Sequence, residues 1–167
     1  RRYLAQFLSD RRVIEWPRAI WLPILYGIVL SKRPKSSGAM YDRIWNKELN
    51  ESPLRTFTRS QSDKLAASLK DYDNVVVDWA MRYGQPSIED AVDRLMDQGC
   101  ERIVMFPLYP QYSATTTATV NDDFFKALMK KRFMPAVRIV PSYEKETVYI
   151  EALAQSIESH IAGLDYE

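Results

Sequence analysis

The chain has 167 residues, of which 46% are hydrophobic and 27% charged, and its formal net charge is +1. This composition fits one soluble globular domain with its own core, and the balanced charge argues against a nucleic-acid partner. One cysteine, Cys100, excludes an internal disulfide. With a single histidine as well, the chain has too few ligands for an ordinary zinc or iron–sulfur site of its own.

The first 71 residues show helical patterns and no strand pattern. A short helix is predicted at residues 2–9. The segment 17–30 is apolar nearly all round, and Pro23 is expected to kink or divide it. Its 14 residues are too few to span a bilayer, which needs about 20. The segment is therefore either core or a surface that meets an apolar partner. A basic loop at 32–35 and helices at 38–47 and 53–71 follow.

From residue 72 onward, strand patterns alternate with helix patterns. Strands are predicted at 75–81, 102–108 and 137–140, and helices after Ser87, at 115–131 and at 145–163. Strands separated by helices of this length favour right-handed crossovers and a parallel sheet.

The pattern as a whole predicts an α/β fold, a three-layer parallel sheet with helices on both faces. We expect a single domain over 1–167, with a mostly helical lip and cover at 1–71 and alternating βα units at 72–167. Three strands are few for such a sheet. We therefore expect the fold to be incomplete at the N-terminus, with at least one further strand preceding Arg1.

The most informative stretch is FPLYPQYSATTT at 106–117, which directly follows a predicted strand. Ligands of open α/β sheets bind beyond the carboxyl ends of the strands. Two phenol rings and several hydroxyls at that position suit a flat aromatic ligand. No glycine-rich loop follows any strand, which disfavours a nucleotide-binding domain.

Extended to residue 120, this stretch resembles the signature of ferrochelatases, which insert ferrous iron into protoporphyrin IX in haem biosynthesis. Further segments resemble the family in the same order, and they are 2–10, 41–45, 51–54, 80–84, 86–88 and 149–157. The resemblance covers essentially the whole chain. It implies a chelatase-like fold of two similar α/β halves with the porphyrin cleft between them, and a cytoplasmic protein, with contact to the inner membrane left open.

The resemblance also shows what this chain lacks. The family's first strand has no match here, and its metal-binding histidine and partner glutamate lie beyond the helix that ends the chain. His160 sits inside that helix, so no catalytic or metal-binding residue is assigned. We expect an inactive N-terminal half whose partner is the missing C-terminal half.

By resemblance, seven residues belong to the porphyrin pocket, and they are Tyr41, Ser52, Arg82, Tyr83, Tyr109, Tyr112 and Ser113. Arg82 would pair with a propionate or hold a water near the metal path, and the alternative is a structural arginine. The phenols of Tyr109 and Tyr112 would contact the porphyrin or hydrated iron, or else be core aromatics. Ser113 and the threonines after it have helix capping as an alternative role. Tyr143 is a weaker candidate near the metal route.

Lys32, Arg33 and Lys35 are candidates for a membrane-facing lip or for propionate anchors, with a solvated basic loop as the alternative. No firmly bound cofactor is expected, and ferrous iron enters as a substrate. Ala114 stands where some ferrochelatases have an iron–sulfur cysteine, and alanine cannot ligate. Two other functions stay open: a cobalt or nickel chelatase, and a non-catalytic half-domain that binds a tetrapyrrole or a partner.

Overall fold

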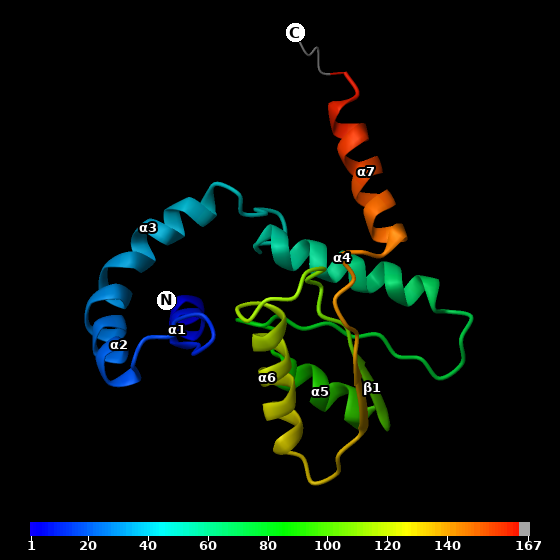
Figure 1. Cartoon of the computed structure of the whole chain (residues 1–167), viewed down its shortest axis with the longest axis horizontal. Coiled ribbons are helices and arrows are strands. Elements are labelled where there is room, and N and C mark those ends of the chain that lie inside the picture. Colours follow the sequence, from blue (N-terminus) through cyan, green and yellow to red (C-terminus); the bar gives the residue numbers. More distant parts are fainter. Residues whose placement is uncertain (164–167) are drawn as a thin grey trace.

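The N-terminal part of the chain is helical. A computed structural model describes residues 1–163, and Figure 1 shows the arrangement of their elements. The elements up to residue 68 are α1 (Arg2–Ser9), α2 (Arg18–Ile24), the π-helical turn η1 (Leu25–Val29), α3 (Leu30–Asp42) and α4 (Pro53–Ser68). We call α1, α2, η1 and α3 the lip helices.

The remaining elements alternate between helix and strand. They are α5 (Ile88–Asp97), β1 (Arg102–Met105), α6 (Thr117–Met129), β2 (Ala136–Ile139) and α7 (Thr147–Ile161). The two strands pair in parallel, with Ile103 opposite Val137. The predicted parallel α/β arrangement is thereby confirmed. We call α5, β1, α6 and β2 the body.

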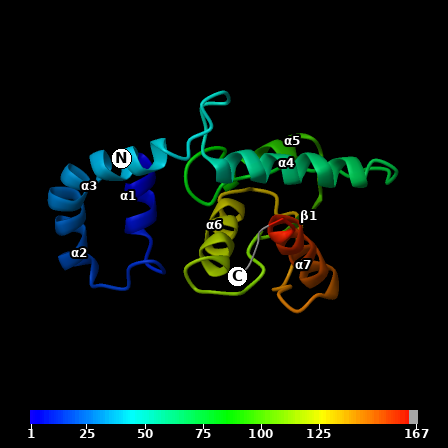
Figure 2. The same ribbon diagram turned by 90° about the horizontal axis from the view of Figure 1, so that it is seen from above.

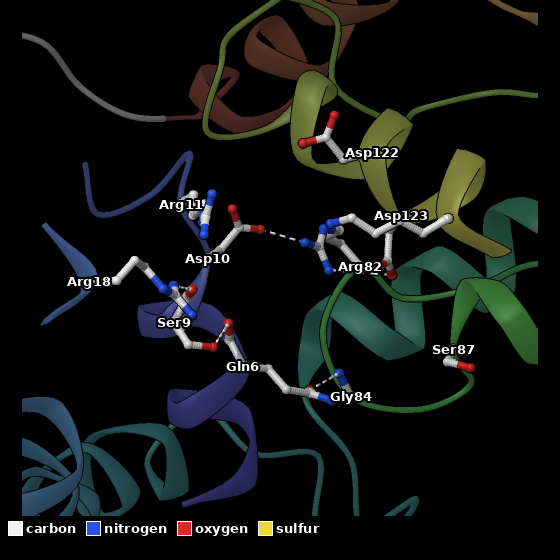
Figure 3. A pocket seen from close by; sticks show the side chains of 11 residues that line it. Gln6, Ser9, Asp10, Arg11, Arg18, Arg82, Gly84, Ser87, Asp122 and Asp123 are labelled. Atoms are coloured by element: carbon white, nitrogen blue, oxygen red, sulfur yellow. Dashed lines mark hydrogen bonds and ion pairs between the residues drawn. The ribbon is translucent and has the colours of Figure 1, made fainter. Parts of the chain in front are cut away.

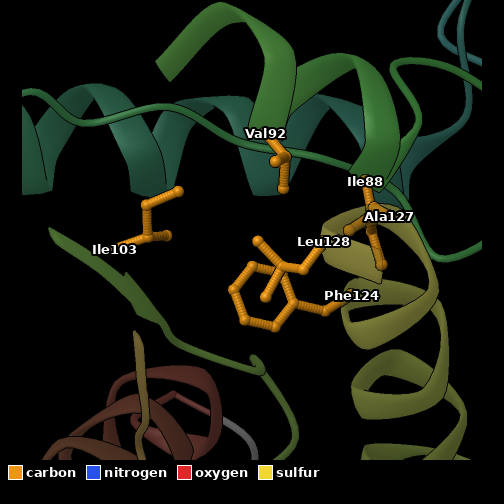
Figure 4. Packing of buried hydrophobic residues seen from close by; sticks show 6 residues of the cluster. All are labelled: Ile88, Val92, Ile103, Phe124, Ala127 and Leu128. Atoms are coloured by element: carbon orange, nitrogen blue, oxygen red, sulfur yellow. The ribbon is translucent and has the colours of Figure 1, made fainter. Parts of the chain in front are cut away.

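The body has a hydrophobic core between α5, α6 and β1 (Figure 4). Val92 of α5, Ile103 of β1 and Phe124 and Leu128 of α6 are each at most 5% exposed. Burying such a side chain contributes roughly 1.5–3 kcal/mol. The sequence predicted helices on both faces of the sheet. On the other face of β1, however, Val104 is 65% exposed, so within residues 1–163 the packed helices cover one face.

The lip helices have a second, separate core. Leu8, Leu25 and Leu30 are buried together, and the indole Nε1 of Trp21 donates a hydrogen bond of 2.7 Å to the carbonyl oxygen of Leu8. Seen from above, the lip helices stand to one side of the body (Figure 2). The two parts therefore do not share one hydrophobic core.

The predicted strand at 75–81 is not formed. Residues 75–80 have no strand hydrogen bonds, and only Met81 makes an isolated bridge, to Ser87. Asp78 satisfies local donors instead, because its Oδ1 accepts the N–H of Trp79 at 2.7 Å and its carboxylate pairs with Arg94. Such local hydrogen bonds compete with a strand ladder. In the described part of the chain, the sheet therefore has two strands rather than three.

The predicted basic loop at 32–35 is also wrong, because these residues lie inside α3. The helix predicted at 38–47 thus begins earlier and ends at Asp42. Two residues after Pro23, the π-helical turn Leu25–Val29 joins α2 to α3 without a loop. A proline removes one backbone donor, and a π-helical turn is one way for the chain to continue past the defect.

The last helix, α7, has no buried residue, and it points away from the body in Figure 1. Its apolar residues Ile150, Leu153 and Ile157 are about half exposed, at 51%, 48% and 52%. These residues recur at helical spacing and form an apolar stripe, but nothing in residues 1–163 covers it. No helix in this part of the chain is both long and apolar enough to cross a membrane.

Candidate functional site

The site centres on Arg82, which lies between the lip helices and α6 (Figure 3). Its side chain is 13% exposed. The guanidinium forms an ion pair with Asp10, which follows α1, and its Nη1 lies 3.4 Å from Oδ2 of Asp123 on α6. Asp10 and Asp123 therefore already balance the positive charge of Arg82, which was predicted to pair with a substrate propionate.

Tyr83 links the same segment to α1. Its hydroxyl donates a hydrogen bond of 3.0 Å to Oδ2 of Asp10, and its ring packs edge-on against Phe7 at 5.3 Å and Tyr3 at 6.1 Å between centroids. Burial raises the pKa of the Tyr83 phenol to about 12, with Arg82 acting in the opposite direction. Tyr83 is therefore a neutral hydrogen-bond donor near neutral pH.

Tyrosines of the lip and of the body meet around Tyr3 of α1. The Tyr3 ring lies 6.4 Å from the ring of Tyr41, at the end of α3. Burial raises the pKa of the Tyr3 phenol, and the nearby phenols of Tyr41 and Tyr109 raise it further. The rings of Tyr41 and Tyr83, both predicted site residues, thus pack edge-on against Tyr3, and Tyr109, a third predicted site residue, acts on the pKa of the Tyr3 phenol. We call these four residues the tyrosine cluster.

Tyr109 is half-buried, at 37% exposed. Burial raises the pKa of its phenol, and the positive charge of Arg82 opposes the rise. The backbone N–H of Tyr143 donates to the carbonyl of Pro110 at 2.9 Å, and the ring of Tyr143 packs on Phe106. The loop after β1 is thereby anchored to the segment after β2.

Tyr112 and Ser113 lie further along the same loop and differ from Tyr109. The Tyr112 side chain is 63% exposed. The hydroxyl of Ser113 lies 2.6 Å from that of Thr116, and the carbonyl of Ser113 accepts the N–H of Ala118. These contacts organise the start of α6, but the helix has no side-chain cap, so the capping role that the sequence left open as an alternative is not formed.

Ser52 has a local role as well, because it caps α4 by accepting the N–H of Arg55 at 3.3 Å. The residue before it, Glu51, is buried and pairs with Arg59 at 2.5 Å and 3.0 Å. Arg59 holds the pKa of this carboxyl below its ordinary value. The cap and the ion pairs together fix the start of α4.

The cavity beside Arg82 has a volume of about 410 Å³ and a mainly polar lining. It lies between the lip helices and α6, and its lining includes Gln6, Asp10, Arg11, Arg82, Asp122 and Lys126. Gln6 accepts the N–H of Gly84 at 2.9 Å, and Arg12 pairs with Asp122 at 2.6 Å and 2.9 Å. Polar contacts thus span the gap between the lip and the body.

The family model described as Ferrochelatase matches residues 1–167. The chain belongs to the ferrochelatase family. It is 78% identical to the ferrochelatase of Brucella anthropi over 167 residues, which is 100% of this chain and 48% of that relative. It is 75% identical to the ferrochelatases of Brucella ovis and Brucella suis, again over all of this chain and 47% of each relative. The chain thus spans about half the length of these curated relatives.

Membership of the ferrochelatase family directs attention to metal ligands. Among residues 1–163, no group of three or more histidine, cysteine, aspartate or glutamate side chains is placed to hold a metal ion. His160 lies on α7, with Nδ1 2.8 Å from the carbonyl oxygen of Ser156 on the preceding turn. This contact is local to the helix and at a distance from the tyrosine cluster in sequence and fold.

Two residues of this candidate site were not identified from the sequence, Tyr3 and Asp10. Tyr3 belongs to the same helical stripe as Phe7, so the sequence interpretation assigned it to a helix face rather than to a site. Asp10 is a carboxylate at the end of a short helix, and most carboxylates are exposed to solvent. Only its hydrogen-bond partners Arg82 and Tyr83, which are 72 and 73 residues away in the sequence, distinguish Asp10 from a solvated acid.

Proposed function

We propose that the longer protein containing this chain is a ferrochelatase, a lyase that inserts ferrous iron into protoporphyrin IX or coproporphyrin. The observation that carries the proposal is the family match over all 167 residues, at 78% identity to a ferrochelatase. The tyrosine cluster agrees with it, because it offers phenol rings from two parts of the fold to a flat aromatic ligand. A cobalt or nickel chelatase fits this family match less well.

The predicted site residues form one wall of the porphyrin pocket in this proposal. Metal insertion requires the two pyrrole protons to leave and the macrocycle to buckle, so a rigid wall shaped to the distorted ring favours the transition state. Tyr41, Tyr83 and Tyr109 supply the wall, with Ser52, Tyr112 and Ser113 at its margins. Arg82 supports the wall, since two carboxylates already balance its charge.

The substrate carboxylates require other cations, and α3 provides them. Lys32, Arg33 and Lys35 are exposed at the start of this helix and are our candidates for the propionates or for an anionic membrane surface. Ile20, Tyr26 and Ile28 on the preceding turns are 55%, 54% and 55% exposed, which favours peripheral contact of segment 17–30 with a membrane. We propose a cytoplasmic location with such contact.

The metal ligand and the base that accepts the pyrrole protons are assigned to the rest of the protein. Ferrous iron is a substrate in this scheme rather than a resident cofactor. Ala114 is exposed and offers no ligand for an iron–sulfur cluster. The part played by this chain is to bind and orient the macrocycle.

A chimaera tests the proposal. This chain replaces the matching residues of the Brucella anthropi ferrochelatase, and haem formation from ferrous iron and protoporphyrin IX or coproporphyrin is followed anaerobically by absorbance. We expect turnover within about tenfold of the parent enzyme, a barrier change below about 1.4 kcal/mol. A folded chimaera without turnover, beside an active parent, would contradict the proposal.

The second candidate, a half-domain that binds a tetrapyrrole without catalysis, is favoured by the absence of a metal-binding group from residues 1–163. The 167-residue chain alone discriminates the two. We expect it to quench porphyrin fluorescence weakly and to form no haem. Turnover by the chain alone would show that its own residues suffice for metal insertion.

A further inference from the structure

One of the side chains that connect the lip helices to the body is the carboxylate of Asp10. The two parts have separate hydrophobic cores, one around Leu25 and one around Phe124. Between them lie polar and edge-on aromatic contacts, and Asp10 contributes two of these, an ion pair with Arg82 (Figure 3) and a hydrogen bond from Tyr83. Its side chain is 9% exposed, which is unusual for an acid at a helix end.

Asp10 uses both carboxylate oxygens. Oδ2 accepts from Nη2 of Arg82 and, at 3.0 Å, from the hydroxyl of Tyr83. Oδ1 accepts the backbone N–H of Arg12 at 2.8 Å, and the Arg12 side chain continues to Asp122 on α6. One carboxylate therefore ties the turn after α1 to the segment after residue 80 and, through Arg12, to α6.

Removal of the Asp10 charge would leave Arg82 poorly compensated. Its remaining carboxylate, Asp123, is 3.4 Å away, and its Nε has no hydrogen-bond partner. A largely buried cation that loses its nearer carboxylate is costly to keep out of water, so we expect the Arg82 side chain to shift toward solvent. Since no shared core holds the lip against the body, the movement would change the spacing between the two parts rather than open a packed core.

We propose that Asp10 is a positioning residue for the porphyrin. It fixes Arg82 and Tyr83 against α1, and in this way sets the distance between Tyr41 on the lip and Tyr109 on the body. The macrocycle contacts both sides, so this spacing determines how well it binds. The inference rests on the proposed function, because it concerns the same pocket.

The test is Asp10→Asn in the active chimaera, assayed well below its melting temperature. Asparagine keeps the shape and one acceptor but removes the charge. We expect KM for the porphyrin to rise about tenfold while kcat stays within about twofold, and a tenfold change corresponds to about 1.4 kcal/mol. Asp10→Glu, which keeps the charge but displaces the carboxylate, should raise KM about threefold and serves if the asparagine variant does not fold.

The matched control is Asp78→Asn. Asp78 forms an equally direct carboxylate–arginine pair, with Arg94 at 2.8 Å and 3.0 Å, and its side chain is 17% exposed. It has no contact with Arg82 or Tyr83 in the hydrogen bonds of the described chain. We expect this variant to lower the melting temperature but to leave KM unchanged.

The outcomes separate the two proposals. An inactive unsubstituted chimaera counts against the proposed function and says nothing against Asp10. In an active chimaera, Asp10 variants that lower the melting temperature with KM unchanged would overturn the positioning role and leave Asp10 an ordinary structural carboxylate. A rise of KM in the Asp78→Asn control as large as in Asp10→Asn would overturn it equally.

Discussion

At the scale of single residues, the tyrosines of the site are defined by their surroundings more than by their hydroxyls. Burial raises the pKa of Tyr3, Tyr83 and Tyr109, so each phenol stays protonated well above neutral pH. A protonated phenol presents a donor and an uncharged π face, which suits a neutral aromatic macrocycle better than a phenolate would. In the proposed function, the cluster therefore binds the ring and does not act as the base.

The shifted pKa of Tyr83 has a consequence for stability. Its folded pKa, about 12, lies above the ordinary value of 10.0. The unfolded chain thus releases the proton first, and stability that is present below about pH 10 is lost as the pH rises toward about 12. The unfolding free energy of the chimaera, measured by urea unfolding, falls as the pH rises from about 9 to about 11. We expect this fall to be smaller in Tyr83→Phe than in the unsubstituted chimaera. An equally steep loss in the variant would contradict this prediction.

At the scale of elements, α6 serves both the core and the site. Its buried face, with Phe124 and Leu128, packs on α5 and β1. Asp122 pairs with Arg12, and Asp123 pairs with Arg82. Arg12 holds the pKa of the Asp122 carboxyl below its ordinary value. The packing of the apolar face of α6 on α5 and β1 therefore determines where its acidic side chains lie.

The packing of α6 is directly testable with neighbouring residues. Leu128 is 1% exposed and Met129 is 77% exposed. We expect Leu128→Ala to lower the unfolding free energy of the chimaera by about 2–5 kcal/mol, because it leaves a cavity in the body core. Met129→Ala should change it by less than about 0.5 kcal/mol. Similar losses in the two variants, measured by urea unfolding, would show that the core lies elsewhere.

At the scale of the whole molecule, the lip helices and the body have separate hydrophobic cores. They contact each other through polar and edge-on aromatic side chains. This arrangement leaves the orientation of the lip helices to a few ion pairs and hydrogen bonds, since shared apolar burial would hold them more strongly. The basic residues of α3 and the exposed apolar side chains of 17–30 both belong to the lip. The lip is accordingly the part of the chain that we assign to substrate entry and membrane contact.

Membrane contact predicts a charge-dependent affinity for vesicles. We expect the triple variant Lys32→Gln, Arg33→Gln, Lys35→Gln to bind vesicles rich in phosphatidylglycerol on the order of 100-fold more weakly, because each cation near an anionic surface contributes about 1 kcal/mol. Co-sedimentation of the chimaera measures this. The exposed lysines of the opposite region, Lys64 and Lys70, provide a control pair, and an equal loss on their replacement by glutamine would show that the lip has no special role.

Much of the fold followed from local spacing. Ser87 predicted the start of α5, and the structure shows a capping box in which Ser87 and Asp90 hydrogen-bond reciprocally. The apolar run at 75–81 was misleading, because strand formation needs a partner as well as propensity. The basic segment 32–35 was likewise predicted as a loop, whereas α3 continues through it with Pro34 inside the helix.

The sequence by itself determined the family and the approximate elements, because motifs such as 106–120 and helical stripes are patterns along the chain. Only the tertiary structure decided that Arg82 is held between two carboxylates, that Tyr3 brings Tyr41 near Tyr83 and Tyr109, and that Asp10 joins the lip to the body. These contacts join residues more than 35 positions apart, as with the 72 that separate Asp10 and Arg82. No local periodicity in the sequence encodes such a pairing, so the contacts between the lip helices and the body form only when the chain is folded.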